Sequence, residues 1–118
     1  MPTKESLLEE IINAVSKLNG GSFSENWSGY IKSPMEGYKI YYYTKLGDFS
    51  IAFGINRNYH GGNDYYQISV HEGKECIQTF IGGTEVECLC KLVFDKVNKY
   101  KEKTTQDSLN KLSNLLES

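Results

Sequence analysis

The sequence predicts an α+β domain with two layers, an antiparallel meander of four to five strands and helices packed on one face. Between Tyr38 and Ile81, aromatic and β-branched residues alternate with polar ones in four successive runs, as in half-buried strands. Short glycine-containing turns close the runs, and they leave no room for the crossovers that parallel strands need. Segments with helical periodicity lie on both sides of the runs.

The length of 118 residues indicates a single domain over residues 1–118. Its first element is predicted to be a helix over residues 4–18, with Thr3 as the N-cap. The apolar residues of this segment recur at helical spacing: Leu7, Leu8, Ile11, Ile12, Val15 and Leu18. Gly20 and Gly21 end the helix, because glycine accepts left-handed backbone geometry after a helix.

The predicted sheet spans residues 27–81. A short first strand is expected from Trp27 to Ile31, before Pro34 breaks the pattern. The clearer strands are Tyr38 to Thr44, Phe49 to Ile55, Tyr65 to His71 and Glu75 to Ile81. Side chains alternate between the two faces of a strand, so the helices should cover Phe49, Ile51, Phe53, Ile55, Tyr66, Ile68 and Val70. Ser50, Ala52, Gln67, Ser69 and His71 then belong to the opposite face, which is expected to be open.

Two helices are expected after the sheet. The first covers residues 85–101, where Thr84 and Glu87 form a predicted capping box. A further short helix is expected over residues 106–116, after a break at Thr104 and Thr105. Its leucines indicate either a helix folded back onto its neighbour, which we favour, or one that binds a partner or a second copy. They are Leu109, Leu112, Leu115 and Leu116.

The open sheet face is the leading candidate for a partner-binding site. Its expected members are Tyr41, Tyr43, Tyr65, Gln67 and His71. Tyrosine offers a large rigid contact area with a hydrogen-bonding tip, and it is enriched at recognition surfaces. The alternative is that these tyrosines only stabilise the sheet by pairing across strands.

The connection from Asn56 to Asp64 is a second candidate site. It contains Arg57, Tyr59 and His60 beside Gly61 and Gly62. An arginine and glycine amides are groups that bind an anionic ligand, although the spacing matches no phosphate-binding loop. The other interpretation is a solvated hairpin tip made of turn-forming residues.

Metal-binding and catalytic patterns are absent from the sequence, so neither a metal nor a cofactor is expected. Cys88 and Cys90 are two residues apart on a predicted helix, which points them to different sides. His60 and His71 lie on different elements. Cys90 belongs to the apolar stripe of its helix, with no base beside it in sequence. We therefore expect that the protein is not an enzyme.

The charge pattern argues against nucleic acid as a partner. The formal net charge is −2, and Arg57 is the only arginine, whereas readers of nucleic acid concentrate basic residues and favour arginine. The apolar runs are far shorter than the roughly 20 residues needed to span a bilayer. No basic-then-apolar leader begins the chain, so a cytoplasmic location is expected, with the three cysteines reduced.

In its lysine-rich composition and element order, the chain resembles the small α+β proteins that phages and mobile elements encode. That resemblance implies stoichiometric binding to a host protein, for example inhibition of a defence nuclease. We therefore expect a small non-enzymatic binding protein that blocks a protein partner, or that associates with itself as a homodimer. The alternative is a small-molecule or nucleotide-binding module that uses residues 56–64 and the open sheet face.

Overall fold

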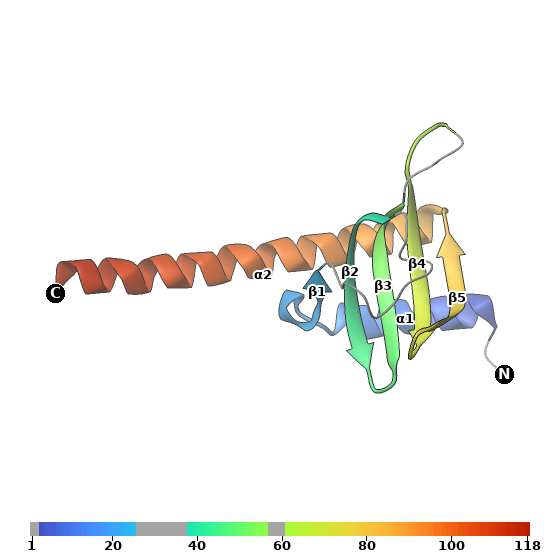
Figure 1. Ribbon diagram of the computed structural model, residues 1–118, viewed down its shortest axis with the longest axis horizontal. Coiled ribbons are helices and arrows are strands. Elements are labelled where there is room, and N and C mark those ends of the chain that lie inside the picture. The colour runs from blue at the N-terminus through green and yellow to red at the C-terminus, as the bar shows by residue number, and fades with distance from the viewer. Residues whose placement is uncertain (1–2, 26–37, 57–60) are drawn as a thin grey trace.

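The computed structural model describes residues 3–25, 38–56 and 61–118, and it confirms the α+β fold (Figure 1). Its strands form one antiparallel sheet in the order β1-β2-β3-β4-β5, the meander expected from the short turns. The strand predicted at residues 27–31 lies outside the described residues. The elements are α1 (Lys4–Ser16), the 3-10 turn η1 (Gly20–Ser22), β1 (Ser24–Glu25), β2 (Tyr38–Leu46), β3 (Phe49–Asn56), β4 (Tyr65–Glu72), β5 (Glu75–Ile81) and α2 (Thr84–Glu117).

Helix α1 begins where the sequence predicts, at a capping box formed by Thr3 and Ser6. The Ser6 amide donates to Thr3 Oγ1 at 3.1 Å, and the Thr3 amide donates to Ser6 Oγ at 2.9 Å. These bonds satisfy two backbone groups at this end of the chain. The helix ends at Ser16, two residues before the predicted end, because the chain tightens there and Leu18 bonds back to the carbonyl of Val15 at 3.0 Å.

Helix α2 is continuous, which corrects the prediction of separate helices over residues 85–101 and 106–116. Thr104 and Thr105 do not break it, and the Thr104 hydroxyl donates to the carbonyl of Lys101 at 3.0 Å. A threonine hydroxyl that bonds back within the helix is compatible with a continuous helix. The capping box predicted at Thr84 is also wrong. The N-cap is Gly83, at φ 87°, and its carbonyl accepts the Glu87 amide at 3.1 Å.

The hydrophobic core lies between the sheet and the two helices. The sheet contributes four residues to this core, as the alternation predicts: Ile51, Phe53, Ile68 and Val70. Phe49 is an exception, because it starts β3 at the tight turn and stays 40% exposed. The helices contribute the other side of the core, with Leu8, Ile11 and Val15 from α1 and Val86, Leu89, Cys90, Val93 and Val97 from α2.

The turn after α1 packs its backbone directly against α2. A Cβ atom on Gly20 would lie 2.1 Å from the Lys96 carbonyl oxygen, and one on Gly21 would lie 2.8 Å from the Tyr100 ring. Gly20 does not have the left-handed backbone expected from its position after a helix. Glycine is therefore required here because the two backbones approach too closely for a side chain to fit between them.

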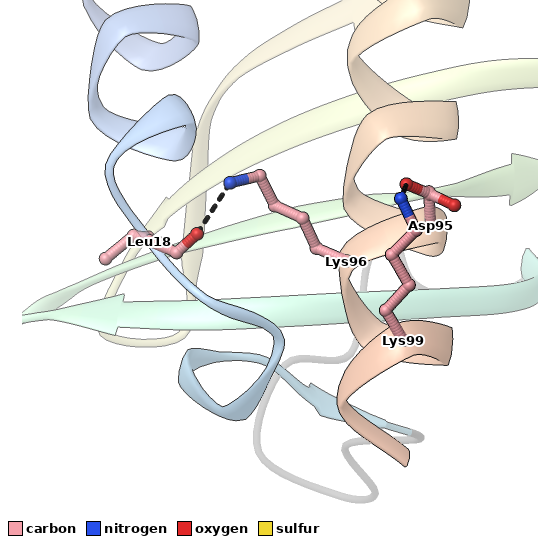
Figure 2. Close-up of polar contacts among 4 residues, drawn as sticks. All are labelled: Leu18, Asp95, Lys96 and Lys99. Atoms are coloured by element: carbon pink, nitrogen blue, oxygen red, sulfur yellow. Dashed lines mark hydrogen bonds and ion pairs between the residues drawn. The ribbon is translucent and has the colours of Figure 1, made fainter. Parts of the chain in front are cut away.

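Lys96 joins the same contact through its side chain. Its Nζ donates to the Leu18 carbonyl at 2.7 Å (Figure 2). It also donates to the Ser16 carbonyl at 3.3 Å. Carbonyls at the C-terminal end of a helix carry partial negative charge and lack partners within the helix. One ammonium group therefore stabilises the end of α1 and ties it to the middle of α2.

Gly20→Ala is expected to destabilise the protein strongly, by about 3 kcal/mol, because the new methyl group meets backbone that cannot move aside. Gly73→Ala is the control. Gly73 has φ 58° and open space around its Cβ position, so the cost there is conformational, about 1 kcal/mol. Urea unfolding of both variants measures the difference. Equal losses would contradict the close-contact argument.

Lys96→Met should lower the free energy of unfolding by about 1.5 kcal/mol, because carbonyls at the end of α1 lose a charged donor. Lys99→Met is the matched control one turn along the helix. Lys99 pairs with Asp95 at 3.0 Å, and both side chains are mostly exposed (Figure 2), so its loss should cost less than about 0.5 kcal/mol. Thermal and urea unfolding of the two variants provide the comparison, and similar values would show that the cap is unimportant.

Candidate functional site

The structure only partly supports the predicted open sheet face. Tyr41, Tyr43 and Tyr65 are half-buried, so each keeps some exposed surface. Gln67 and His71 are buried, with 3% and 0% of their surface exposed, and their assignment to a solvent-facing surface is wrong. Alternation along a strand predicts which residues share a face, but it does not predict whether that face is covered.

Polar side chains on the face of β3 and β4 away from the helices form a buried polar layer. Its members, Ser50, Asn56, Gln67, Ser69 and His71, are each no more than 6% exposed. Asn56 Nδ2 donates to Gln67 Oε1 at 2.9 Å, and His71 Nε2 lies 3.1 Å from Ser69 Oγ. The sequence predicts that most of these residues share a face, but it does not predict their burial. The small residues Ser50, Ala52 and Gly54 on that face were the one signal that it could be closely covered.

Ser69 and His71 have the spacing of a nucleophile and its base, but their surroundings do not suit catalysis. Neither side chain has solvent-exposed surface. Among the described residues, the Nδ1 atom of His71 has no hydrogen-bond partner, whereas a catalytic histidine is oriented by a group at that atom. This pair is therefore best explained as part of the interior. The expectation that the protein is not an enzyme stays a prediction.

Cys88 and Cys90 differ in exposure as their positions on α2 predict. Cys90 is buried, its Sγ lies 3.7 Å from the Gln67 carbonyl, and burial raises the pKa of its thiol to about 12. A thiol with that pKa is a poor nucleophile at neutral pH. Cys76 and Cys88 are exposed. Within the described residues, no group of three or more His, Cys, Asp and Glu side chains is placed to hold a metal ion.

The second candidate site depends on residues that the structure does not describe. Arg57, Tyr59 and His60 lie outside the described ranges. Residues 61–64, which follow them, are exposed. Gly61 and Gly62 have φ values of 86° and 99°, as a turn requires. Anion binding by this segment stays a prediction.

Within residues 3–25, 38–56 and 61–118, exposed leucines are concentrated in the C-terminal half of α2. This half, residues 101–117, extends beyond the sheet as a straight helix, and all of its residues are exposed (Figure 1). We call it the projecting half of α2. Its leucines are exposed by 53%, 51%, 73% and 77% at Leu109, Leu112, Leu115 and Leu116. The favoured prediction that this segment folds back is wrong, because an unbroken helix carries it away from the body.

An apolar groove runs between the two helices near the start of α2. It has a volume of about 260 Å³ and is lined by Ile12 of α1 and by Thr84, Glu85, Cys88, Leu89 and Leu92 of α2. Leu92 is 37% exposed there. Sequence reasoning missed this groove, because it forms only where α1 and α2 lie side by side.

A larger depression of about 450 Å³ lies nearby, between the start of α1, the end of β5 and the start of α2. Its walls include Leu8, Phe80, Ile81 and Val86, with Lys4 and Glu85 among its charged residues. The Lys4 ammonium lies 5.5 Å from the centre of the Phe80 ring. The apolar walls of both hollows give this end of the molecule a capacity to bind apolar side chains.

Comparisons with known proteins give no further indication of function. No family model matches the chain, and no curated protein or solved structure matches it. In the described part of the chain, no helix has the combination of length and apolar character that crossing a membrane requires.

Protein stability should fall as the pH drops below about 6.5, because burial lowers the pKa of His71 from its usual 6.5. Between the lowered folded-state value and 6.5, the unfolded chain binds more protons at this site. The contribution of His71 to the free energy of unfolding is thus complete above pH 6.5. It is lost as the pH falls through the pKa that His71 has in the folded protein. Its register neighbours on β3 and β5, Ser50 and Cys76, add no charge.

Urea unfolding at several pH values between 7.5 and 5.5 measures this effect. The matched variant is His71→Gln, which should be less stable throughout but should show a flatter pH dependence over this range. An equal pH dependence in both proteins would mean that His71 does not titrate differently in the folded state.

Proposed function

We propose that this is a non-enzymatic binding protein that contacts another protein through the projecting half of α2. The observation that carries the proposal is the exposure of Leu109, Leu112, Leu115 and Leu116 along a helix held away from the body. Large contiguous apolar patches on folded proteins usually mark interaction sites. A helix that presents apolar residues at spacings of three and four is a common recognition element.

The anchoring of α2 favours this role. Its first half contributes Val86, Leu89, Cys90, Val93 and Val97 to the core, so the projecting half continues a helix that is already formed. An isolated helix of this length is only marginally stable in water. Here the body supplies the nucleus, and a partner meets a preformed surface with a small ordering cost.

The mode of action that we propose is stoichiometric contact with a protein partner. Blocking of a host enzyme, which the resemblance to phage-encoded proteins implies, is one form of such contact and stays a prediction. Binding of a small ligand by residues 56–64 has no comparable support, because three of the residues it depends on lie outside the described ranges.

Leu112→Asp combined with Leu116→Asp should abolish protein binding at this surface while leaving the fold intact, because both side chains are exposed. The matched control is Asn110→Asp combined with Asn114→Asp. It adds the same charge about 200° around the helix from the leucines. Far-UV circular dichroism and thermal unfolding check that both variants fold.

The binding measurement is affinity capture of each tagged protein from bacterial cells that also produce an untagged copy. Quantitative mass spectrometry then reads every recovered protein, the untagged copy included. We expect at least one protein to be recovered with the wild type and the control, and more than tenfold less with the leucine variant. If no recovered protein depends on the leucines, the proposal is wrong.

A further inference from the structure

Strand β5 is the outermost strand at one edge of the sheet, and α1 passes behind it (Figure 1). The Gly82 amide donates to the Tyr66 carbonyl at 3.1 Å, and Ile81 is the register partner of Gln67. In an antiparallel pair, residues that bond the neighbouring strand alternate with residues whose backbone groups point away from it. The amide and carbonyl groups of Thr79 and Ile81 are therefore directed outward, away from β4.

The outward carbonyl of Thr79 is bonded by a side chain of its own strand. The side-chain amide of Gln78 donates to it at 2.9 Å, whereas a further strand would supply a backbone amide at this place. A glutamine side chain loses conformational freedom when it is held in this way. The backbone amide of another strand can therefore replace it at low cost.

The side chains along this edge are uncharged and partly apolar. Thr79 pairs with Ser69, which belongs to the buried polar layer on the face away from the helices. Alternation places Ile77 and Ile81 on the same face, and they are 50% and 60% exposed. Natural edge strands are usually protected by lysine, proline or an inward-pointing charge. Residues 77–81 contain none of these, so this edge is open to pairing with another strand.

We propose that a second copy of this chain pairs with this edge, β5 against β5, antiparallel about a twofold axis at Thr79. In this register Thr79 lies opposite Thr79 of the other copy, and Ile77 lies opposite Ile81. The outward backbone groups then face each other, and each pair exchanges two hydrogen bonds. The same strand is used on both copies, as twofold symmetry requires. This inference goes beyond the proposed function, because it concerns a different surface.

The occupant is a second copy because the pattern of this edge matches itself when the strand direction is reversed. Each of the two pairs of Ile77 with Ile81 brings together exposed apolar side chains, which leave water on pairing. Opposed threonines, as at the axis, are a favourable cross-strand pair. Glu75, the first charged residue before the paired stretch, is level with Gly83 of the other copy. No like charges are therefore opposed along the two strands.

A bulge sets the length of the pair. The register between β4 and β5 shifts between Val70 and His71, so Ile77 has no partner on β4 within the described strands. The extra residue of a bulge is left unpaired by its own ladder, and it is available here to the other copy. The pair comprises residues 77–81 of each copy, far fewer than the roughly 20–30 residues a side of a standard interface. We therefore expect a reversible dimer with a dissociation constant in the micromolar range.

The first test is sedimentation velocity of the purified full-length protein from micromolar to millimolar concentrations. The wild type should change from monomer to dimer over this range. Ile77→Lys with Ile81→Lys should stay monomeric, with a dissociation constant raised at least a hundredfold, because a lysine faces a lysine in both outer pairs. A wild type that is monomeric throughout, or a double-lysine variant that dimerises as the wild type does, would overturn the proposal.

The matched variant is Ile77→Lys with Ile81→Glu, which changes the same two positions. In the proposed register each lysine faces a glutamate of the other copy, so this variant should dimerise at least tenfold more tightly than the double-lysine variant. The difference should shrink at high salt, because screening weakens exposed charge pairs. Circular dichroism and thermal unfolding check that both variants fold. Equal dissociation constants for the two variants would reject this register.

The second test locates the twofold axis. In a background of Cys76→Ser with Cys88→Ser, Thr79→Cys is oxidised mildly. Opposed residues of this kind have Cα atoms about 5.5 Å apart, within the range that a disulfide spans, so a covalent dimer is expected. Ile77→Cys in the same background is the control, because its two thiols are offset by about 13 Å along the strands. Equal cross-linking at both positions, or none at position 79, would overturn the axis at Thr79.

The outcomes separate this inference from the proposed function. The β5 variants leave the projecting half of α2 unchanged, and Leu112→Asp with Leu116→Asp leaves β5 unchanged. A wild type that stays monomeric but captures a protein through its leucines would reject the β5 pair and keep the proposed function. Dimerisation through β5 without any capture that depends on the leucines would keep this inference and reject the proposed function.

Discussion

The arrangement of this molecule depends on the contact between the turn after α1 and the middle of α2. Gly20 brings its backbone against the Lys96 carbonyl, where any side chain would collide. The Lys96 ammonium then reaches back to the carbonyls of Ser16 and Leu18. One contact thus sets the separation of the two helices, stabilises the end of α1 and lies just before the point where α2 leaves the body.

This contact affects both the apolar groove between α1 and α2 and the projecting half of α2. It holds α1 beside α2, which creates the groove lined by Ile12, Cys88 and Leu92. It also fixes the direction of the projecting half, because the helix continues without interruption from Tyr100 to Glu117. A surface built on a helix anchored in this way is presented in one orientation, whereas the same leucines on a loose tail would sample many.

Much of the fold could be predicted from the sequence, because local patterns determine it. The meander follows from alternation and short turns, and the N-cap of α1 follows from Thr3. The continuity of α2 could not be predicted, because the weak helix propensity of Thr104 and Thr105 is easily outweighed by a helix already formed on either side. The cap at Gly83 was missed for a related reason. Thr84 with Glu87 has the spacing of a capping box, but the turn geometry there begins the helix one residue earlier.

The candidate site was predicted less well, because burial depends on contacts between distant segments. The alternation correctly placed Gln67, Ser69 and His71 together on one face, yet it gave no information on whether that face is covered. From the sequence, the leucines after residue 108 indicate either a contact helix or a helix folded back onto its neighbour, and the second is favoured. Folding back requires that the domain can bury its own apolar residues, and a rigid continuous helix prevents it.

The burial of the polar layer is consistent with a contact surface on a helix, as we propose, and not on the face of the sheet. When helices cover only one face of a sheet, the other face is open to partners. The tyrosines on that face make it the natural candidate for a partner-binding site. In β3 and β4, however, residues on both faces are buried: Phe53 and Ile68 on one side, Ser69 and His71 on the other. The centre of the sheet is therefore committed to the interior. Extending α2 beyond the body supplies a new surface without exposing the core, and four exposed leucines lie on that extension.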